Sequence, residues 1–298
     1  MTFTIAATVD EALAALASGA RPVAGGSDLV VGARHGKSPL PTDLVAIDRI
    51  DGLRTIDQTD AGLRVGALVS HARLMTDAAV VGGYTGLADA AALVGSPATR
   101  HVGTLGGNVM NASPAMDTGA PLLVLEATAE LRSVDGIREV PVGELWTGPG
   151  RTVATADELC TALVISTRPD RSGSAYVRLE YRRAMEIAVV GAAASVVLDD
   201  DGSIGSLAVA LSAVAPTIVS VDVSSLTGRV VDDALLSEVA DLASERATPI
   251  SDLRASDRYR RHTVGVMARR AVEAAARRAR GEHIAVPVNR AFGIGATA

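Results

Sequence analysis

The chain has 298 residues, a formal net charge of −6 and 48% hydrophobic residues, which is typical of a folded globular protein of about two domains. The acidic balance and the 2% aromatic content argue against a nucleic-acid-binding protein. Cys160 is the only cysteine, so the chain alone can form no internal disulfide, iron–sulfur cluster or cysteine-built zinc site. Acidic residues near the start and a longest apolar run of only residues 187–198 predict a cytoplasmic protein without a signal peptide or an integral membrane segment.

The first predicted segment contains a helix, a strand, a glycine turn and a second strand. Thr8 and Glu11 have the spacing of a capping box before an alanine–leucine run. Short strands are expected at residues 22–24 and 44–47, with the glycine turn following the first of them. We place the boundary of this segment at residue 55.

The middle segment, residues 56–170, is predicted to mix hairpins with short helices. A loop rich in glycine, asparagine and serine is expected over residues 95–119, and its apolar flanks favour a functional loop over a disordered one. The other expected elements are a hairpin turning at 60–62, helices starting at Ser70 and covering 87–94 and 120–127, a hairpin turning at 135–136, and a strand over 159–165.

The last segment, residues 171–298, completes an α+β chain without repeats. Its expected elements are a strand over 174–182 with outward-pointing polar residues, a hairpin of 189–198 and 207–215, and helices over 233–246 and 256–280. The final helix carries eight arginines, which we interpret as a solvated face; partner binding is an alternative, and the acidic chain disfavours RNA.

Two glycine motifs are the main candidates for a ligand site. The first, VAGGSDL at residues 23–29, follows a predicted strand; paired glycines let successive amides point the same way and let the main chain touch a ligand, and Ser27 adds a hydroxyl donor. An ordinary tight turn between strands is the alternative.

The second motif, TLGGN at residues 104–108, could complete a cradle for a diphosphate. Asp117 further along would suit a ribose hydroxyl, because a carboxylate accepts strongly from O–H. The alternative is a glycine-rich surface loop with Asp117 as a helix N-cap. Neither motif has the glycine spacing of a Rossmann fold or a P-loop.

Taken together, seven blocks in one order resemble the FAD-binding subunit of molybdenum hydroxylases, the family of the carbon monoxide dehydrogenase medium subunit and the xanthine dehydrogenase FAD-binding subunit. The blocks are AGGSDLV (24–30), ATRHVGTLGGNVMNASPAMDTGAPLL (98–123), WTGPGRT (146–152), DELCTALVI (157–165), AYVRLEYRRAMEIAVVG (175–191), VALSAVAPT (209–217) and PISDLRASDRYRRH (249–262).

The resemblance implies two α/β subdomains, residues 1–55 and 56–170, that form a PCMH-type FAD-binding fold, followed by a C-terminal antiparallel sheet with helices, residues 171–298. It implies FAD as the cofactor, with its diphosphate held by both glycine motifs and its nucleotide half held in part by Asp117. The residues implied to contact the cofactor are Val23, Ala24, Gly25, Gly26, Ser27, Asp28, Leu29, Val94, Thr104, Gly106, Gly107, Asn108, Asp117, Cys160, Arg178 and Ile187.

Two positions depart from the family pattern. Arg178 stands where a lysine is often found near the flavin; a cation there would favour reduced flavin, and a solvent-facing strand residue is the alternative. Leu145-Trp146 replaces the aromatic pair often found before TGPG. For Cys160, a small buried hydrophobe is compatible with lining the site. Ile187 matches a residue that covers the isoalloxazine ring.

The resemblance also implies partners and a function. A large molybdopterin-binding subunit would oxidise the substrate, a small [2Fe–2S] subunit would carry the electrons, and the flavin would pass them to quinone, oxygen or NAD in a dimer of heterotrimers. The five histidines lack metal-ligand spacing and are expected at the surface or behind the site, so we expect no metal site and no catalytic side chain. The alternatives are a self-sufficient flavin oxidase or reductase, and an assembly subunit without flavin.

Overall fold

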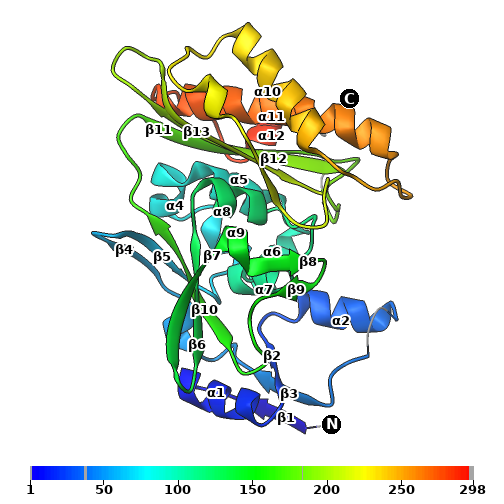
Figure 1. Cartoon of the computed structure of the whole chain (residues 1–298). Coiled ribbons are helices and arrows are strands. Elements are labelled where there is room, and N and C mark those ends of the chain that lie inside the picture. Colours follow the sequence, from blue (N-terminus) through cyan, green and yellow to red (C-terminus); the bar gives the residue numbers. More distant parts are fainter. Residues whose placement is uncertain (1, 37–38, 183, 295–298) are drawn as a thin grey trace.

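The computed structural model describes residues 2–36, 39–182 and 184–294, and its strands form three larger sheets stacked along the molecule (Figure 1). The N-terminal sheet is parallel and has the order β1-β3-β2. Thr8 caps its helix by accepting from the Glu11 amide at 3.2 Å, which confirms the predicted cap, while the Glu11 carboxylate accepts from the Ala7 amide at 2.8 Å, one residue before the N-cap of a strict capping box. Its elements are β1 (Thr2–Ile5), α1 (Val9–Ala17), β2 (Arg21–Val23), α2 (Ser27–Arg34) and β3 (Asp43–Ala46).

The middle sheet is antiparallel, in the order β4-β5-β10-β6-β7, and both predicted hairpins are confirmed. The predicted strand over 159–165 is its central strand β10. The strands are β4 (Ile56–Thr59), β5 (Gly62–Gly66), β6 (Thr128–Ser133), β7 (Gly136–Pro141) and β10 (Leu159–Ser166), after a 3-10 turn at Asp51–Leu53; a small pair, β8 (Trp146–Gly148) and β9 (Arg151–Thr152), lies beside them.

Short helices connect the strands of the middle segment, and the predicted long loop over 95–119 is wrong. Two helices, α6 and α7, lie within it, capped by Ser96 and Thr104, whose hydroxyls accept from amides three residues ahead. The sequence analysis expected a loop because this segment is rich in glycine, asparagine and serine, and serine is one of the residue types that cap these helices. The helices are α3 (His71–Leu74), α4 (Ala78–Gly83), α5 (Thr85–Leu93), α6 (Pro97–Val102), α7 (Leu105–Met110), α8 (Gly119–Val124) and α9 (Val142–Leu145).

The C-terminal sheet is antiparallel, in the order β11-β12-β13-β14, and lies between two helical layers (Figure 1). Helices α10 and α11 cover its outer face, and α5 and α8 of the middle segment cover the other. The predicted hairpin and both long helices are confirmed. The elements are β11 (Ser172–Leu179), β12 (Val190–Leu198), β13 (Ile204–Ser212), β14 (Val219–Val221), a 3-10 turn at Ser224–Leu226, α10 (Asp233–Arg246), α11 (Asp257–Ala279) and α12 (Val288–Ala291).

Burial on both faces of this sheet corrects two expectations. Ser174, Tyr176 and Arg178 alternate along β11 as predicted, but they face the middle segment and are buried instead of pointing to solvent. On α11, Arg260 is buried and the Arg278 side chain is only 6% exposed, so its arginines are not all on a solvated face. Buried polar side chains of β11 therefore lie beside apolar residues such as Ala193 and Ala210 at the contact between the C-terminal sheet and the middle segment.

Candidate functional site

The first glycine turn joins β2 to helix α2, so the prediction of an ordinary turn between two strands is wrong. Gly26 is the N-cap of α2 and has φ +68°, a left-handed conformation that glycine adopts without strain. No side chain caps the helix, and its first turn leaves backbone amides that the helix itself cannot satisfy. These amides, the positive end of the helix dipole and the Ser27 hydroxyl suit a phosphate group.

The second glycine turn leads from α6 into α7, and its amides are already used. The Leu105 amide donates to the Val69 carbonyl and the Gly106 amide to the Ala67 carbonyl, both at 2.9 Å; the Gly107 amide donates to Thr104 Oγ1 at 3.2 Å. The Gly106-Gly107 pair therefore does not present free amides to a ligand. A Cβ on Gly106 would lie 2.5 Å from the Ala67 side chain, so this glycine lets α7 pack closely against the end of β5.

The two turns are in direct contact, as a shared cradle requires. A Cβ on Gly25 would overlap the carbonyl oxygen of Val102 and lie 2.5 Å from its carbonyl carbon. One at Gly103 would lie 3.7 Å from the Ser27 hydroxyl. The surfaces of Gly25 and Gly107 remain exposed. The N-terminal amides of α2 thus lie beside the second turn, which is the arrangement that a shared cradle needs.

His71 lies directly behind the second turn, where sequence reasoning singled out no residue. Its amide donates to the Gly103 carbonyl at 3.1 Å, and its ring carbon Cδ2 lies 3.3 Å from where a Gly103 Cβ would be. The side chain is 1% exposed, and Nδ1 has no partner within the described residues. Burial, reinforced by the positive charge of Arg100, lowers the pKa of His71 to about 4, so the imidazole is neutral at pH 7.

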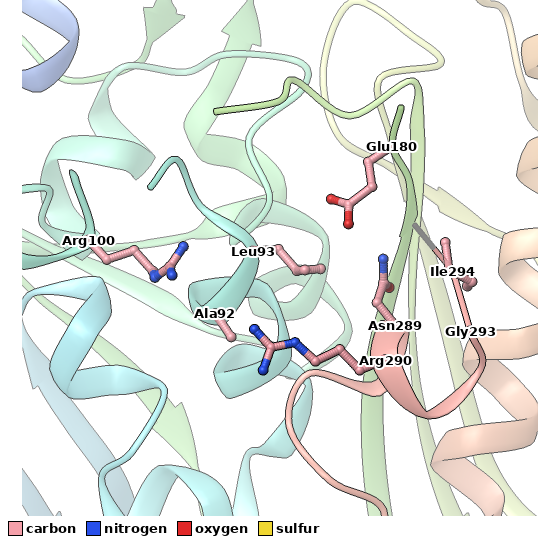
Figure 2. A pocket seen from close by; sticks show the side chains of 8 residues that line it. All are labelled: Ala92, Leu93, Arg100, Glu180, Asn289, Arg290, Gly293 and Ile294. Carbon is pink, nitrogen blue, oxygen red and sulfur yellow. The ribbon is translucent and has the colours of Figure 1, made fainter. Parts of the chain in front are cut away.

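A cavity of about 230 Å³ lies between α5, the end of β11 and α12, and Arg100 of α6 lines it as well. Arg100 and Arg290 point into it from opposite sides, and Glu180 faces them (Figure 2). Nη1 of Arg100 donates to the carbonyl of Val94 at 2.9 Å, which joins the half-buried Val94 to the cavity wall. The remaining lining residues are Ala92, Leu93, Asn289, Gly293 and Ile294.

A buried charge network connects Asp117 to this cavity. Arg178 Nη1 donates to Asp117 Oδ2, and Nε donates to Glu180 Oε2, both at 2.7 Å. The Tyr176 hydroxyl donates to Asp117 Oδ1 at 2.9 Å. Burial tends to lower the pKa of Arg178, but the charges of Asp117 and Glu180 outweigh it and hold this pKa above its ordinary value. Burial raises the pKa of Glu180 and, helped by Asp117, that of Tyr176.

The network decides between the alternatives for two residues. Asp117 is not the N-cap of α8, because Thr118 holds that position and the Asp117 oxygens bind Tyr176 and Arg178. A solvent-facing Arg178 is also wrong, since its side chain is 0% exposed. In this conformation the Arg178 guanidinium is bound to Asp117 and Glu180, so it affects the site by fixing and neutralising these two carboxylates. Its direct contact with flavin stays a prediction.

The remaining predicted site residues lie in three places: the middle sheet, the segment between β11 and β12, and the glycine turns themselves. Cys160 is buried in the core of the middle sheet, and burial raises its pKa to about 12, so it is a small hydrophobe there. Ile187 is 47% exposed in the segment between β11 and β12, which is fastened to the start of α6 by the Met185 amide and the Gly95 carbonyl at 2.9 Å. Val23, Ala24 and Leu29 are half-buried around the first turn, and Asn108 is half-buried in α7.

The fold and this site define a flavoprotein subunit of the PCMH type. Residues 1–167 match the family described as FAD binding domain in molybdopterin dehydrogenase, and residues 174–275 match CO dehydrogenase flavoprotein C-terminal domain. The chain belongs to this family of FAD-binding oxidoreductase subunits.

Individual relatives are similar in sequence to nearly the whole of this chain. It is 30% identical to the xanthine dehydrogenase FAD-binding subunit of Escherichia coli O157:H7, covering 93% of this chain and 96% of the relative. It is also 30% identical to the carbon monoxide dehydrogenase medium chain of Afipia carboxidovorans, over 90% and 93%. Among solved structures, reconstituted CO dehydrogenase from Oligotropha carboxidovorans matches with a TM-score of 0.88 and 29% identity, over 93% and 98%.

The residues present fit FAD. Phosphate oxygens find the uncapped first turn of α2 and the Ser27 hydroxyl, beside two exposed glycine surfaces that leave room for a ligand. The half-buried Val94 and the exposed Ile187 offer apolar contacts on the side of the positively charged cavity. Within the described residues, no group of acidic, histidine or cysteine side chains could hold a metal ion, and no helix is long and apolar enough to cross a membrane.

Proposed function

We propose that this chain is the electron-transferring flavin subunit of a molybdopterin-dependent hydroxylase or dehydrogenase. FAD, when bound, supplies the redox chemistry: it accepts electrons from [2Fe–2S] clusters on a small partner and releases them to an external acceptor. A large partner carries molybdopterin and oxidises the substrate. We assign the complex to the cytoplasm and expect it to be a dimer of heterotrimers. Within this chain, we place the domain boundaries near residues 55 and 170.

The contact between the two glycine turns carries this proposal. The amides of the α2 first turn and the Ser27 hydroxyl bind the diphosphate, and the turn around Gly103 and Thr104 closes the cradle from the other side. His71 supports that second turn as a neutral group, so it packs behind the turn without placing a buried charge there. Gly107 and Asn108 extend the contact surface beyond the turn.

The charge network fixes two carboxylates of the site, Asp117 for the nucleotide half of the cofactor and Glu180 at the cavity. Tyr176 and Arg178 fix both oxygens of Asp117, and each oxygen retains a lone pair that can accept from a hydroxyl of the cofactor. Arg178 also fixes Glu180 at the cavity. Val94 and Ile187 contact the ring, and Cys160 contributes packing behind it. These side chains bind and orient, and none of them transfers a proton or forms a covalent bond with substrate.

The cysteine count supports this division of labour. With Cys160 alone, and that residue buried, the chain cannot hold the clusters that feed its flavin, so it needs an iron–sulfur partner. The family it belongs to is named for molybdopterin dehydrogenases, which supports a molybdopterin subunit as the source of the electrons.

Anaerobic reduction of the bound FAD tests the proposal. The chain purified from its native host with its partners should contain molybdenum, iron and FAD, and substrate should bleach its flavin absorbance. The isolated FAD-loaded chain should show no bleaching with the same substrate. Bleaching in the isolated chain would establish a self-sufficient oxidase or reductase, and a native complex without FAD would establish an assembly subunit.

A further inference from the structure

The cavity between α5, β11 and α12 holds more positive charge than its carboxylates balance. Three guanidinium groups, those of Arg100, Arg178 and Arg290, act on one another around it. The facing carboxylates are Asp117 and Glu180, and both are bound to Arg178. Glu186 lies near Glu180, but it pairs with Arg182 at 3.3 Å.

Among the residues that the structure describes, Arg100 and Arg290 therefore have no anionic partner. The one side-chain hydrogen bond of Arg100 within the described residues goes to the neutral carbonyl of Val94, and the Arg290 side chain makes none there. Burial lowers the pKa of Arg100, and repulsion from Arg290 and then Arg178 lowers it further. Figure 2 shows the two side chains entering the cavity from different elements, α6 and α12, with their guanidinium groups directed at the same space.

Helix α12 is anchored in a way that fixes Arg290 at the cavity. The buried Asn289 accepts from the Arg178 amide at 3.1 Å and donates to the Arg178 carbonyl at 2.9 Å. One residue earlier, the Val288 amide donates to the buried Asp89 carboxylate at 2.9 Å. Two buried attachments next to Arg290 hold the backbone that carries this side chain at the cavity before a ligand arrives, which reduces part of the entropy cost of binding.

We propose that Arg100 and Arg290 form an anion-binding site in this cavity. Guanidinium groups donate in a planar fork that suits a carboxylate, a phosphate or a deprotonated imide with its adjacent carbonyl. Two sources fit this chemistry: the reduced flavin, whose pyrimidine edge carries negative charge, and an anionic group on the external electron acceptor. The flavin source rests on the proposed function, whereas the existence of the anion site does not.

The variant that tests the site is Arg290→Met, because Arg290 is exposed and has no side-chain partner in the described chain that folding would miss. Arg290→Lys retains the charge but loses the fork. Arg280→Met is the matched control, an exposed arginine at the end of α11 that makes the same change in net charge away from the cavity. Thermal melts of all three confirm folding.

Two measurements separate the sources. The first is the midpoint potential of FAD in the loaded chain: if the site favours reduced flavin, Arg290→Met weakens that preference about tenfold, which lowers the potential by about 30 mV. The second is calorimetric titration of the full chain with inorganic phosphate at low ionic strength, with and without FAD. If the site serves the acceptor, phosphate binds the FAD-loaded chain, and Arg290→Met weakens this about tenfold.

Either effect supports the site, provided that Arg290→Lys shows a smaller loss and Arg280→Met shows none. If both measurements on Arg290→Met equal those on Arg280→Met, the cavity is not an anion site. A wild-type chain that takes up no FAD refutes the proposed function instead. In that case, phosphate binding to the FAD-free chain still decides whether the anion site exists.

Discussion

Replacing Gly25 by alanine should separate FAD binding from folding. The added Cβ would overlap the Val102 carbonyl oxygen and lie 2.5 Å from the carbonyl carbon, where real Cβ contacts are essentially never closer than 3.0 Å. Both atoms belong to the backbone, so no side-chain rotation can relieve the overlap. The first glycine turn must move away from the second, which disrupts the cradle between them.

The structure sets the size of both effects. Restoring ordinary contact requires a shift of more than about 1 Å, and a misplacement of about 1 Å can already weaken a positioned interaction about 100-fold. We therefore expect FAD affinity to fall about 100-fold, or about 2.8 kcal/mol. Overpacking costs about 1–3 kcal/mol of stability. We expect the lower end here, because α2 buries no residue and can shift with the turn.

Fluorescence titration with FAD and urea unfolding of the FAD-free chain measure the two quantities. The control is Gly32→Ala in the same helix, where a Cβ meets no atom within 4 Å. It should leave FAD affinity unchanged and stabilise the helix by up to about 1 kcal/mol. If Gly25→Ala is folded and binds FAD within about threefold of the wild type, the turns do not grip the cofactor together.

Three further predictions concern buried titratable groups. His71 has a pKa of about 4 in the folded chain against 6.5 in the unfolded one, so its contribution to stability is complete above pH 6.5 and falls by about 3 kcal/mol toward pH 4. Urea melts across this pH range should show the loss, and the His71→Leu variant should lack the part of the pH dependence that comes from His71. Asp89→Asn leaves the 6%-exposed Arg278 side chain without its carboxylate and should lower the free energy of unfolding by about 3–5 kcal/mol in urea melts, whereas a loss below about 1 kcal/mol would contradict a buried pair. The Cys160 thiol, with its pKa raised to about 12 by burial, should resist iodoacetamide at mildly alkaline pH until the chain is unfolded, and rapid labelling of the native chain would contradict its burial.

Local patterns predicted most of the fold. Capping residues, hairpin turns and alternating apolar residues located α1, both middle hairpins and the long C-terminal helices. The same reasoning failed for β1, an exposed edge strand, and for α2, whose residues are not buried and so lack an apolar stripe. It also treated α6 and α7 as loop, because their caps and glycines resemble loop composition.

The parts of the site that could be predicted are those in which a short sequence motif determines the local backbone conformation. Paired glycines pointed to both turns, and the family blocks added the residues that lie outside the two motifs. The sequence predicted the alternation of Ser174, Tyr176 and Arg178 along a strand. It did not predict that helices cover both faces of that strand and so bury these side chains. His71 and Arg290 could not be found, because their importance comes from tertiary neighbours: His71 from packing behind Gly103, and Arg290 from the anchoring of α12.

Backbone amide hydrogen exchange with and without FAD tests the shared cradle most directly. The account predicts that FAD slows exchange in the first turn of α2 and changes little at residues 105–107, whose amides already have protein partners. Saturating FAD that leaves α2 exchange unchanged, or that protects a surface away from both glycine turns, would contradict it.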